Sequence, residues 1–508
     1  MRGMHTSIHD IRRQIFTEVA RMAYEGGDYS RIIEELPYKI IPGEEAHYRE
    51  SIFLERAIVG ERLRLAIGLP LRSVGEHSLL SEGIDASAIA EKYYDPPLIN
   101  MIKFACHGCP EKQYRVTDCC QGCIAHPCSE ACPQDAVIVH KSGRSVIDTG
   151  KCIRCGKCAA ACPYGAIIKL DRPCAASCGM NAIGTDKNGK ADIDQDKCVS
   201  CGMCLVNCPF GAISDKGQIF QLIQSMKQGD KVIAIVAPAF VGQFGPNLPP
   251  QKFWPAMRQL GFYDVAEVSV GADLCTIQEA RDFLKEVPDE IPFMATSCCP
   301  SWSVMAKKLF PAQAKCISMA LTPMVLTARL QKREHPDCKI AFIGPCASKK
   351  LEASRRTIRS EVDFVLTFEE LMGMFEAKEV DFSLISEEER LEVGTGAGRG
   401  FAVGGGVAKA VADAIQDMEP GREVKIASAQ GLDECKKLLT MAKAGKYNGY
   451  LLEGMACPGG CVAGAGTLQP IAKSTAAIVK VVREAKLQKA TESVYDEETL
   501  KLLEDEPE

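Results

Sequence analysis

Cysteine is the residue type whose number and spacing in this chain point to a chemical role. The sequence has 26 cysteines among 508 residues, and 17 of them lie between Cys106 and Cys208. Two runs, beginning at Cys152 and Cys198, have the spacing C-x2-C-x2-C-x3-C-P, and a third, beginning at Cys120, has a longer second gap. Three thiolates of such a run bind one [4Fe–4S] cubane, and the cysteine before proline binds the neighbouring cluster. Zinc ribbons lack this exchange, so the spacing predicts iron–sulfur clusters.

The repeated runs predict three to four accessory clusters, because each run exchanges its last cysteine with a partner run. The predicted ligand sets are Cys120, Cys123, Cys128 and Cys162; Cys152, Cys155, Cys158 and Cys132; Cys178, Cys198, Cys201 and Cys204; and Cys106, Cys109, Cys174 and Cys208. The last two sets depend on a degenerate run at Cys174 and Cys178. Cys119 is left over and could replace Cys109 as a ligand.

Five further cysteines follow short apolar stretches at 293–297, 339–345 and 450–455. They are Cys298, Cys299, Cys346, Cys457 and Cys461. In an open α/β sheet, ligands bind beyond the carboxyl ends of the strands. The pattern therefore predicts one pocket lined by thiols.

The elements that must position these cysteines form an α/β catalytic domain at 216–477, which we expect to consist of two lobes of parallel sheet flanked by helices. Its predicted elements include a buried strand at 231–238, a strand at 265–270 and a helix from about Ile277 to Val287. The glycine-rich stretch at 394–400 lacks the G-x-G-x-x-G order of nucleotide-binding loops and predicts a flexible loop.

Three other regions flank this domain. An α+β ferredoxin-like cluster domain is predicted at 99–215 and a small helical region at 1–98, whose role the sequence does not reveal. The composition of residues 478–508 predicts a charged and helical tail that is exposed to solvent.

Composition narrows the class of protein. The net charge of −6 gives no reason to expect a nucleic-acid or membrane partner. No apolar run approaches the roughly 20 residues of a membrane span, and the polar start at Met1–Arg12 does not resemble an export signal. We therefore expect a cytoplasmic protein whose cysteines bind metal rather than form disulfides.

Three motifs around the predicted pocket resemble the signature motifs of [FeFe]-hydrogenases, and the resemblance spans about 216–470. They are Thr296-Ser-Cys-Cys-Pro-x-Trp302, Pro345-Cys-x-x-Lys-x-x-Glu352 and Glu453-x-Met-Ala-Cys-x-x-Gly-Cys461. The family implies an H-cluster, a [4Fe–4S] cubane joined by one thiolate to a two-iron unit with CO, cyanide and a dithiolate bridge. The resemblance assigns the cubane to Cys299, Cys346, Cys457 and Cys461, with Cys461 as the bridging ligand.

The resemblance also implies roles for residues that are not ligands. Lys349 would contact one cyanide by a charge-assisted hydrogen bond. Further contacts to the two-iron unit would come from Ala237, Pro238, Thr322 and Met455. Cys298 would pass protons, and a path of Glu279, Asp282 and Ser318 would continue the transfer. Gly344, where the family usually has methionine, and Met324 indicate a divergent branch.

The resemblance implies an anaerobic hydrogenase that interconverts protons and electrons with H2. Electrons would pass through the accessory clusters to a soluble ferredoxin, and maturation proteins would supply the two-iron unit. One alternative is a hydrogen or redox sensor, which would often lack a cysteine at the position of Cys298. A second is an iron–sulfur assembly factor of the same fold, which should lack both Cys298 and Lys349.

Overall fold

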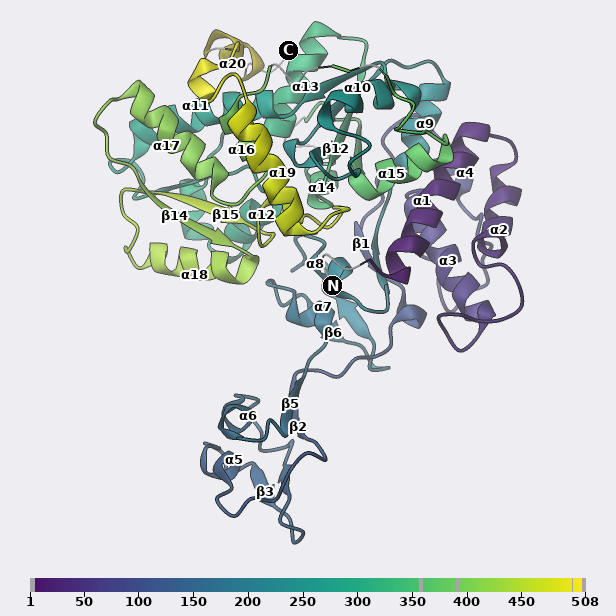
Figure 1. Cartoon of the computed structure of the whole chain (residues 1–508), viewed down its shortest axis with the longest axis vertical. Helices are drawn as coiled ribbons and strands as arrows, with labels where there is room; N and C mark the ends of the chain where they lie inside the picture. The colour runs from purple at the N-terminus through teal and green to yellow at the C-terminus, as the bar shows by residue number, and fades with distance from the viewer. Residues whose placement is uncertain (1–4, 356–359, 387, 390–392, 496, 505–508) are drawn as a thin grey trace.

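The computed structural model describes residues 5–355, 360–386, 388–389, 393–495 and 497–504. Figure 1 shows a large α/β body with a helical region at one side and a small module that extends away from it. No helix among the described residues is long and apolar enough to cross a membrane.

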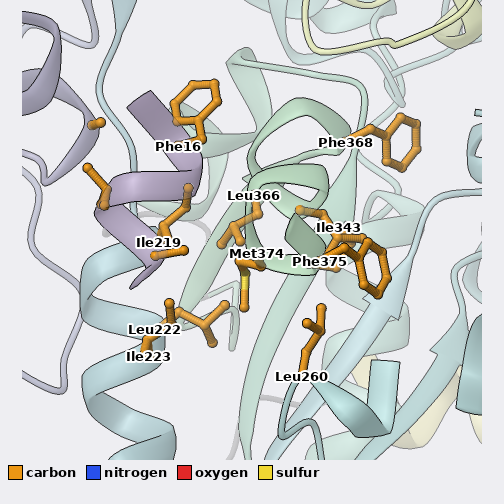
Figure 2. Close-up of a cluster of buried hydrophobic side chains, with 14 of the residues drawn as sticks. Phe16, Ile219, Leu222, Ile223, Leu260, Ile343, Leu366, Phe368, Met374 and Phe375 are labelled. Carbon is orange, nitrogen blue, oxygen red and sulfur yellow. The ribbon is translucent and has the colours of Figure 1, made fainter. Parts of the chain in front are cut away.

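The N-terminal region is helical, as the sequence predicts. It consists of α1 (Ser7–Glu25), α2 (Tyr29–Ile40), α3 (Ile52–Ala66) and α4 (Ile84–Ser87). The buried side of α1 packs against α9 (Ile219–Lys227) and α15 (Phe368–Ala377). Phe16 of α1 lies in one apolar cluster with Leu366 and Phe368, as Figure 2 shows. The helices therefore share the core of the α/β body instead of forming a separate unit.

The cysteine-rich region folds into two small modules of short hairpins and helical turns. The distal module (residues 113–170) contains β2 (Gln113–Val116), α5 (Pro127–Glu130), β3 (Val137–Val139), β4 (Ser145–Ile147), α6 (Lys157–Ala161) and β5 (Ile167–Leu170). The proximal module (residues 99–112 and 171–215) contains β1 (Ile99–Met101), η1 (Lys103–Ala105), α7 (Pro173–Ala176), β6 (Ile183–Thr185), β7 (Ala191–Ile193), α8 (Met203–Asn207) and β8 (Ile213–Asp215). The antiparallel pair β2–β5 joins the distal module to the rest (Figure 1).

Two separate parallel sheets form the centre of the α/β body. The first has the order β10-β9-β12-β13, with bounds β9 (Val232–Val236), β10 (Asp264–Glu267), β12 (Lys339–Gly344) and β13 (Phe364–Thr367). The second has the order β11-β15-β14, with bounds β11 (Met294–Ala295), β14 (Lys425–Gln430) and β15 (Tyr450–Met455). The strands that precede the pocket cysteines are thus divided between two sheets, and a parallel-sheet α/β architecture is confirmed.

Helices pack around both sheets. They are η2 (Pro238–Phe240), α10 (Pro250–Gln259), α11 (Ser269–Glu286), α12 (Pro300–Leu309), η3 (Pro311–Cys316), α13 (Pro323–Glu334), α14 (Ser348–Ala353), α16 (Gly396–Gly400), α17 (Gly406–Met418), α18 (Leu432–Lys443), η4 (Cys461–Ala463), α19 (Ile471–Glu484), η5 (Ala490–Glu492) and α20 (Glu497–Glu504). The helix predicted from Ile277 begins eight residues earlier, because the strand before it ends at Glu267.

The expectation of an exposed C-terminal tail is wrong. The boundary placed at 477/478 falls inside α19. Leu500 and Leu503 of α20 are buried against Val270 and Leu274 of α11, and Arg329 donates a hydrogen bond to the Leu503 carbonyl at 2.7 Å. Leucines three residues apart lie on one face of a helix, so α20 can bury both while Glu498 and Lys501 stay in solvent.

Candidate metal-cluster site

One cavity lies where the carboxyl ends of the two sheets meet. Most of its lining residues are apolar, and many directly follow the strands β9, β10, β11, β12 and β15. The wall brings together nine residues predicted for the site, namely Ala237, Pro238, Cys298, Cys299, Cys346, Lys349, Met455, Cys457 and Cys461. Thr322, Glu279, Asp282 and Ser318 do not line it.

The chemistry of the cavity thiols fits an iron–sulfur cluster. Burial raises the pKa of Cys461 to about 12 and also raises the pKa of Cys299, and each is raised further by Cys346. Buried thiols of this kind carry protons until a metal replaces them, because a thiolate costs free energy in an apolar site. Among the described residues no His, Cys, Asp and Glu group converges on a single ion. A cubane instead separates its ligands across the cluster.

Lys349 is the charged residue of the cavity wall. Its Nζ lies 2.6 Å from Glu352 Oε2, and Thr322 donates a hydrogen bond to Glu352 Oε1 at 2.6 Å. Burial lowers the pKa of Lys349, but Glu352 and then Cys346 more than offset this, so the pKa is raised. Lys349 therefore presents a permanent cation to the cavity, and Thr322 holds Glu352, the ion-pair partner of Lys349.

Ala237 cannot donate its backbone N–H into the cavity. That group donates to the carbonyl of Ile343 at 2.9 Å, which continues the β9–β12 ladder. Pro238 has no N–H. Neither residue can therefore offer a backbone N–H to a group in the cavity, and both contribute apolar wall.

Glu279 lies fully buried on α11 and contacts the residue that precedes Cys298. Its Oε1 accepts a hydrogen bond from the Ser297 N–H at 3.1 Å. Burial raises the pKa of Glu279 to about 7, while the Ser297 N–H and the Ser318 hydroxyl lower it in part. Burial also raises the pKa of Cys298 well above its ordinary value, and Glu279 is the charged group that raises it most. Asp282 follows Glu279 by three residues on α11 and is half-buried, so the acids share one side of the helix.

Glu279 should make the protein less stable as the pH rises. Its folded pKa of about 7 lies above the ordinary value of 4.5, so the folded protein keeps a proton that the unfolded chain releases between these values. The contribution of Glu279 to the free energy of unfolding is fully present below pH 4.5. Up to about 3 kcal/mol of it is lost as the pH rises through about 7. Glu279→Gln should abolish this dependence in urea unfolding of protein that lacks the two-iron unit. If the free energy of unfolding depended on pH in the same way for the native protein and for Glu279→Gln, the raised pKa of Glu279 would be contradicted.

Glu453, the first residue of the third motif, holds the helix beside the cavity. It is fully buried and accepts hydrogen bonds from the Gly405 N–H at 2.6 Å and the Ala408 N–H at 2.8 Å. The first N–H groups of a helix have no partner within the helix, so this carboxylate satisfies the start of α17. The sequence shows the residue but not this role, since its partners lie about 45 residues away.

The glycine-rich stretch at 394–400 is not a flexible loop. It forms α16, which is held by Thr395 donating to Asp273 at 2.5 Å and by a bidentate pair of Arg399 with Glu267 at 3.0 and 2.9 Å. Its glycines allow the close approach to α11. Phe401 and Ala402, which follow directly, line the cavity. The stretch therefore positions one wall of the cavity. It is rich in glycine because α16 packs closely against α11, where a larger side chain would not fit.

Gly398→Ala should destabilise the protein, whereas Gly400→Ala should not. A Cβ at Gly398 would lie 2.4 Å from the Ser269 carbonyl oxygen and 2.6 Å from Asp273 Oδ1, but one at Gly400 meets no atom within 4 Å. We expect a loss of about 1–3 kcal/mol for the first variant and a neutral or slightly favourable effect for the second. Urea unfolding of both variants measures the difference. Equal losses would show that α16 is not packed as described.

Several proximal cysteines lie close to cysteines of the same predicted set. Burial raises the pKa of Cys204, and Cys201, Cys198 and Cys178 raise it further as close neighbours. Burial likewise raises the pKa of Cys109, with Cys106 and Cys208 as its neighbouring thiols. Cys174 has Cys208 and Cys106 beside it. The structure thus places Cys109, not Cys119, next to the last group.

The distal cysteines surround a small core of their own. Cys128 and Cys158 are buried there with Val137 and Ile167, and Cys132 and Cys162 pack against them. Burial raises the pKa of Cys158, which Cys152 and Cys132 raise further. Ser145 contacts both Cys120 and Cys128, since its backbone lowers the pKa of Cys120 and its Oγ lies 3.3 Å from the Cys128 Sγ. Cys119 and Cys155 are exposed.

Comparison with known families covers both the cavity and the cysteine-rich modules. Residues 145–168 and 190–213 match 4Fe–4S binding domains. Residues 230–465, which contain the whole cavity wall, match the iron-only hydrogenase large subunit, C-terminal domain. Residues 230–465 belong to the iron-only hydrogenase family. The resemblance inferred from the three motifs is thereby confirmed, and this segment is called the hydrogenase-family domain below.

Relatives of the hydrogenase-family domain include proteins of different activities. The chain is 28% identical over 305 residues to Iron hydrogenase 1 of Clostridium pasteurianum, which covers 50% of this chain and 53% of the relative. It is 26% identical over 388 residues to the NADP-reducing hydrogenase subunit HndD of Solidesulfovibrio fructosivorans, with coverages of 65% and 58%. It is 27% identical over 268 residues to the probable cytosolic Fe-S cluster assembly factor GJ13047 of Drosophila virilis, with coverages of 42% and 56%. The chain thus spans little more than half the length of these relatives, and family membership leaves the activity open.

Proposed function

We propose that this chain is an [FeFe]-hydrogenase that interconverts protons and electrons with H2. The observation that carries the proposal is the composition of one cavity wall, where Cys298 and the cation Lys349 lie together with four further thiols. We also propose that the two parallel sheets are the two lobes that enclose an H-cluster. When bound, that cluster would supply the metal site at which the H–H bond is made or broken.

The residues of the wall would divide the work of holding the cluster. Cys299, Cys346, Cys457 and Cys461 would bind the cubane. Lys349, kept charged by Glu352, would attract a cyanide ligand in an apolar site where the ion–dipole interaction is not weakened by water. Met455 is buried and would pack a polarizable thioether against the cluster. The neighbouring apolar residues exclude water from the reacting centre.

Proton transfer would run from Cys298 to the protein surface through Glu279. The thiol lies in the cavity wall, and Glu279 influences its charge and has a pKa of about 7, which suits reversible exchange near neutral pH. Ser318 and Asp282 would continue the path, because the first contacts Glu279 and the second lies one turn farther along α11, at the border of the solvent.

Electron transfer would enter through the proximal module. Cys201 and Cys299 are close enough for one thiol to raise the pKa of the other. The Ser301 hydroxyl donates to the Val199 carbonyl at 3.0 Å, and Lys308 donates to the Cys198 carbonyl at 3.1 Å. These bonds fix the loop that carries Cys198 and Cys201 against α12, the helix that follows Cys299. We propose that the accessory clusters connect this point to a soluble ferredoxin.

An iron–sulfur assembly factor is the second candidate, and it is favoured by the similarity to a protein of that name. Cysteines that hold a cubane serve either function. The first candidate is favoured by Cys298 and Lys349, since a cubane alone gives neither residue a task in the cavity.

The proposed function is tested by loading anaerobically purified protein with the two-iron cofactor. Infrared bands of CO and cyanide together with rapid H2 evolution from reduced viologen are the expected result. The same bands with negligible turnover would indicate a sensor. An absence of bands, with iron analysis showing that the cubanes are intact, would indicate the assembly factor.

A further inference from the structure

One proposed ligand set of the proximal module lies against α3 of the N-terminal region. We call it the Cys208 set, and it consists of Cys106, Cys109, Cys174 and Cys208. Cys106 and Cys208 are buried in one apolar cluster with Leu65 of α3. The Ala191 N–H donates to the Cys106 Sγ at 3.4 Å, and the Ala212 N–H donates to the Cys208 Sγ at 3.3 Å. Buried thiols that accept backbone N–H groups fit the ligands of an iron–sulfur cluster.

Arg62 of α3 is a buried cation beside this set. It is 5% exposed, and its guanidinium donates a hydrogen bond to the Gly211 carbonyl. The Gly211 N–H in turn donates to the Cys208 carbonyl at 3.1 Å, so a single turn of the chain separates the cation from the thiol. Burial and then Arg12 lower the pKa of Arg62 to about 10, whereas Cys208 raises it in part. Arg62 therefore stays protonated at neutral pH.

Arg62 has one more donor than its surroundings use. Its Nε is buried and has no hydrogen-bond partner among the described residues. A buried N–H group without an acceptor costs free energy. A cluster held by Cys208 would bring further sulfur atoms, which are acceptors, to this part of the chain. The unused donor therefore favours a negatively charged group beside α3.

Further cations approach the Cys208 set from other segments. Arg172 is 4% exposed and donates to the Cys109 carbonyl at 3.0 and 2.9 Å. Lys190 donates to the Cys106 carbonyl at 2.5 Å. Arg49, which is half-buried, donates at 3.3 Å to the carbonyl of the residue directly before Cys106. The potential around these thiols is therefore strongly positive, and Arg62 is the contribution of α3 to it.

We propose that the buried charge of Arg62 raises the reduction potential of the [4Fe–4S] cluster held by the Cys208 set, an inference that rests on the proposed function and its accessory clusters. Reduction adds one electron, and hence one negative charge, to the cluster, and no covalent bond changes. A cation nearby stabilises the reduced form more than the oxidised form, and burial keeps water from weakening the attraction. The N-terminal region would thereby make one proximal cluster easier to reduce.

The test is a redox titration of the full chain with its cubane clusters reconstituted and without the two-iron unit. Sodium dithionite and mediators set the potential, and electron paramagnetic resonance measures the reduced clusters. Arg62→Gln removes the charge but keeps an N–H donor for the Gly211 carbonyl. It should lower the midpoint potential of one cluster, so that the ratio of reduced to oxidised cluster at a fixed potential falls about tenfold, or about 59 mV for one electron. Arg62→Lys keeps the charge and should keep most of the native potential.

The matched control is Arg64→Gln on the same helix. Arg64 is 4% exposed and donates to the carbonyls of Leu80 and Glu82 at 2.7 Å each, so its partners belong to the N-terminal region itself. This variant should leave every midpoint potential unchanged. Cys109→Ala, which removes one ligand of the Cys208 set, should eliminate the same spectral component that Arg62→Gln shifts.

Unchanged midpoint potentials in Arg62→Gln, with an iron content equal to that of the native protein, would overturn the proposal. An equal shift in Arg64→Gln or in Arg62→Lys would overturn it as well, because the cause would then be disturbed packing of α3 and not the lost charge. If Arg62→Gln fails to fold, Arg49→Gln at the half-buried cation should give a smaller shift of the same component, and no shift would contradict the proposed effect of charge. Because no step of this test produces or consumes H2, its failure is distinguishable from failure of the proposed function.

Discussion

Cys298→Ala should lose turnover by a factor of about 10²–10⁴ while the infrared bands of the loaded protein stay unchanged. That range is typical for removing a positioned proton donor or acceptor. The thiol lines the cavity and has Glu279 as its neighbouring acid. The other titratable groups of the cavity wall are Lys349 and the four proposed ligands, which already have other roles. H2 evolution from reduced viologen and the infrared spectrum, measured on the same sample, test this expectation.

Cys275→Ala is the matched control for that variant. Cys275 is a fully buried thiol on α11 that also neighbours Glu279, but it does not line the cavity. Its loss should cost some stability and leave turnover within a few-fold of native. If Cys298→Ala lost its spectrum in parallel with its activity, Cys298 would be a structural residue. Full activity of Cys298→Ala would remove it from the proton path.

Lys350→Met should reduce the free energy of unfolding by about 3–5 kcal/mol, because it removes the ion-pair partner of two buried carboxylates. Lys350 is 1% exposed. Its Nζ lies 2.9 Å from Asp215 Oδ2 and 2.9 Å from Glu370 Oε1, and it donates to the Lys216 carbonyl at 2.8 Å. This residue thereby joins the end of the proximal module to α14 and α15. Urea unfolding followed by circular dichroism measures the loss.

The pH dependence of Lys350→Met separates the loss of charge from the loss of packing. Without the ammonium, the pKa values of Asp215 and Glu370 should both rise in the folded state. A buried carboxyl group whose pKa is raised in the folded state is neutral below that pKa. Above it the group ionises, and the free energy of unfolding falls. The loss should therefore be larger at about pH 8 than at about pH 5.5, and adding Glu370→Gln should recover part of it. A loss that is independent of pH would indicate a packing defect instead.

Local spacing was sufficient to predict the chemistry of the cysteines. In the runs at Cys152 and Cys198 three ligands of one cubane are separated by only two residues each, so both runs can be recognised from the sequence, and both fall inside matched 4Fe–4S domains. Strands that end on cysteine also predicted a pocket at the carboxyl ends of parallel strands. A separate C-terminal tail was predicted wrongly, because charge composition does not show that Leu500 and Leu503 find an apolar partner surface on α11.

The sequence by itself determined which residues could bind iron, while only the tertiary structure decided how their surroundings are held. The partners of Glu453, of Asp273 and of Lys350 lie between 20 and 135 residues away in the chain. Buried polar groups must find partners wherever the fold brings them, and no local spacing records that choice. The same reason explains why α16 reads as a loop from its glycines and yet forms a packed wall of the cavity.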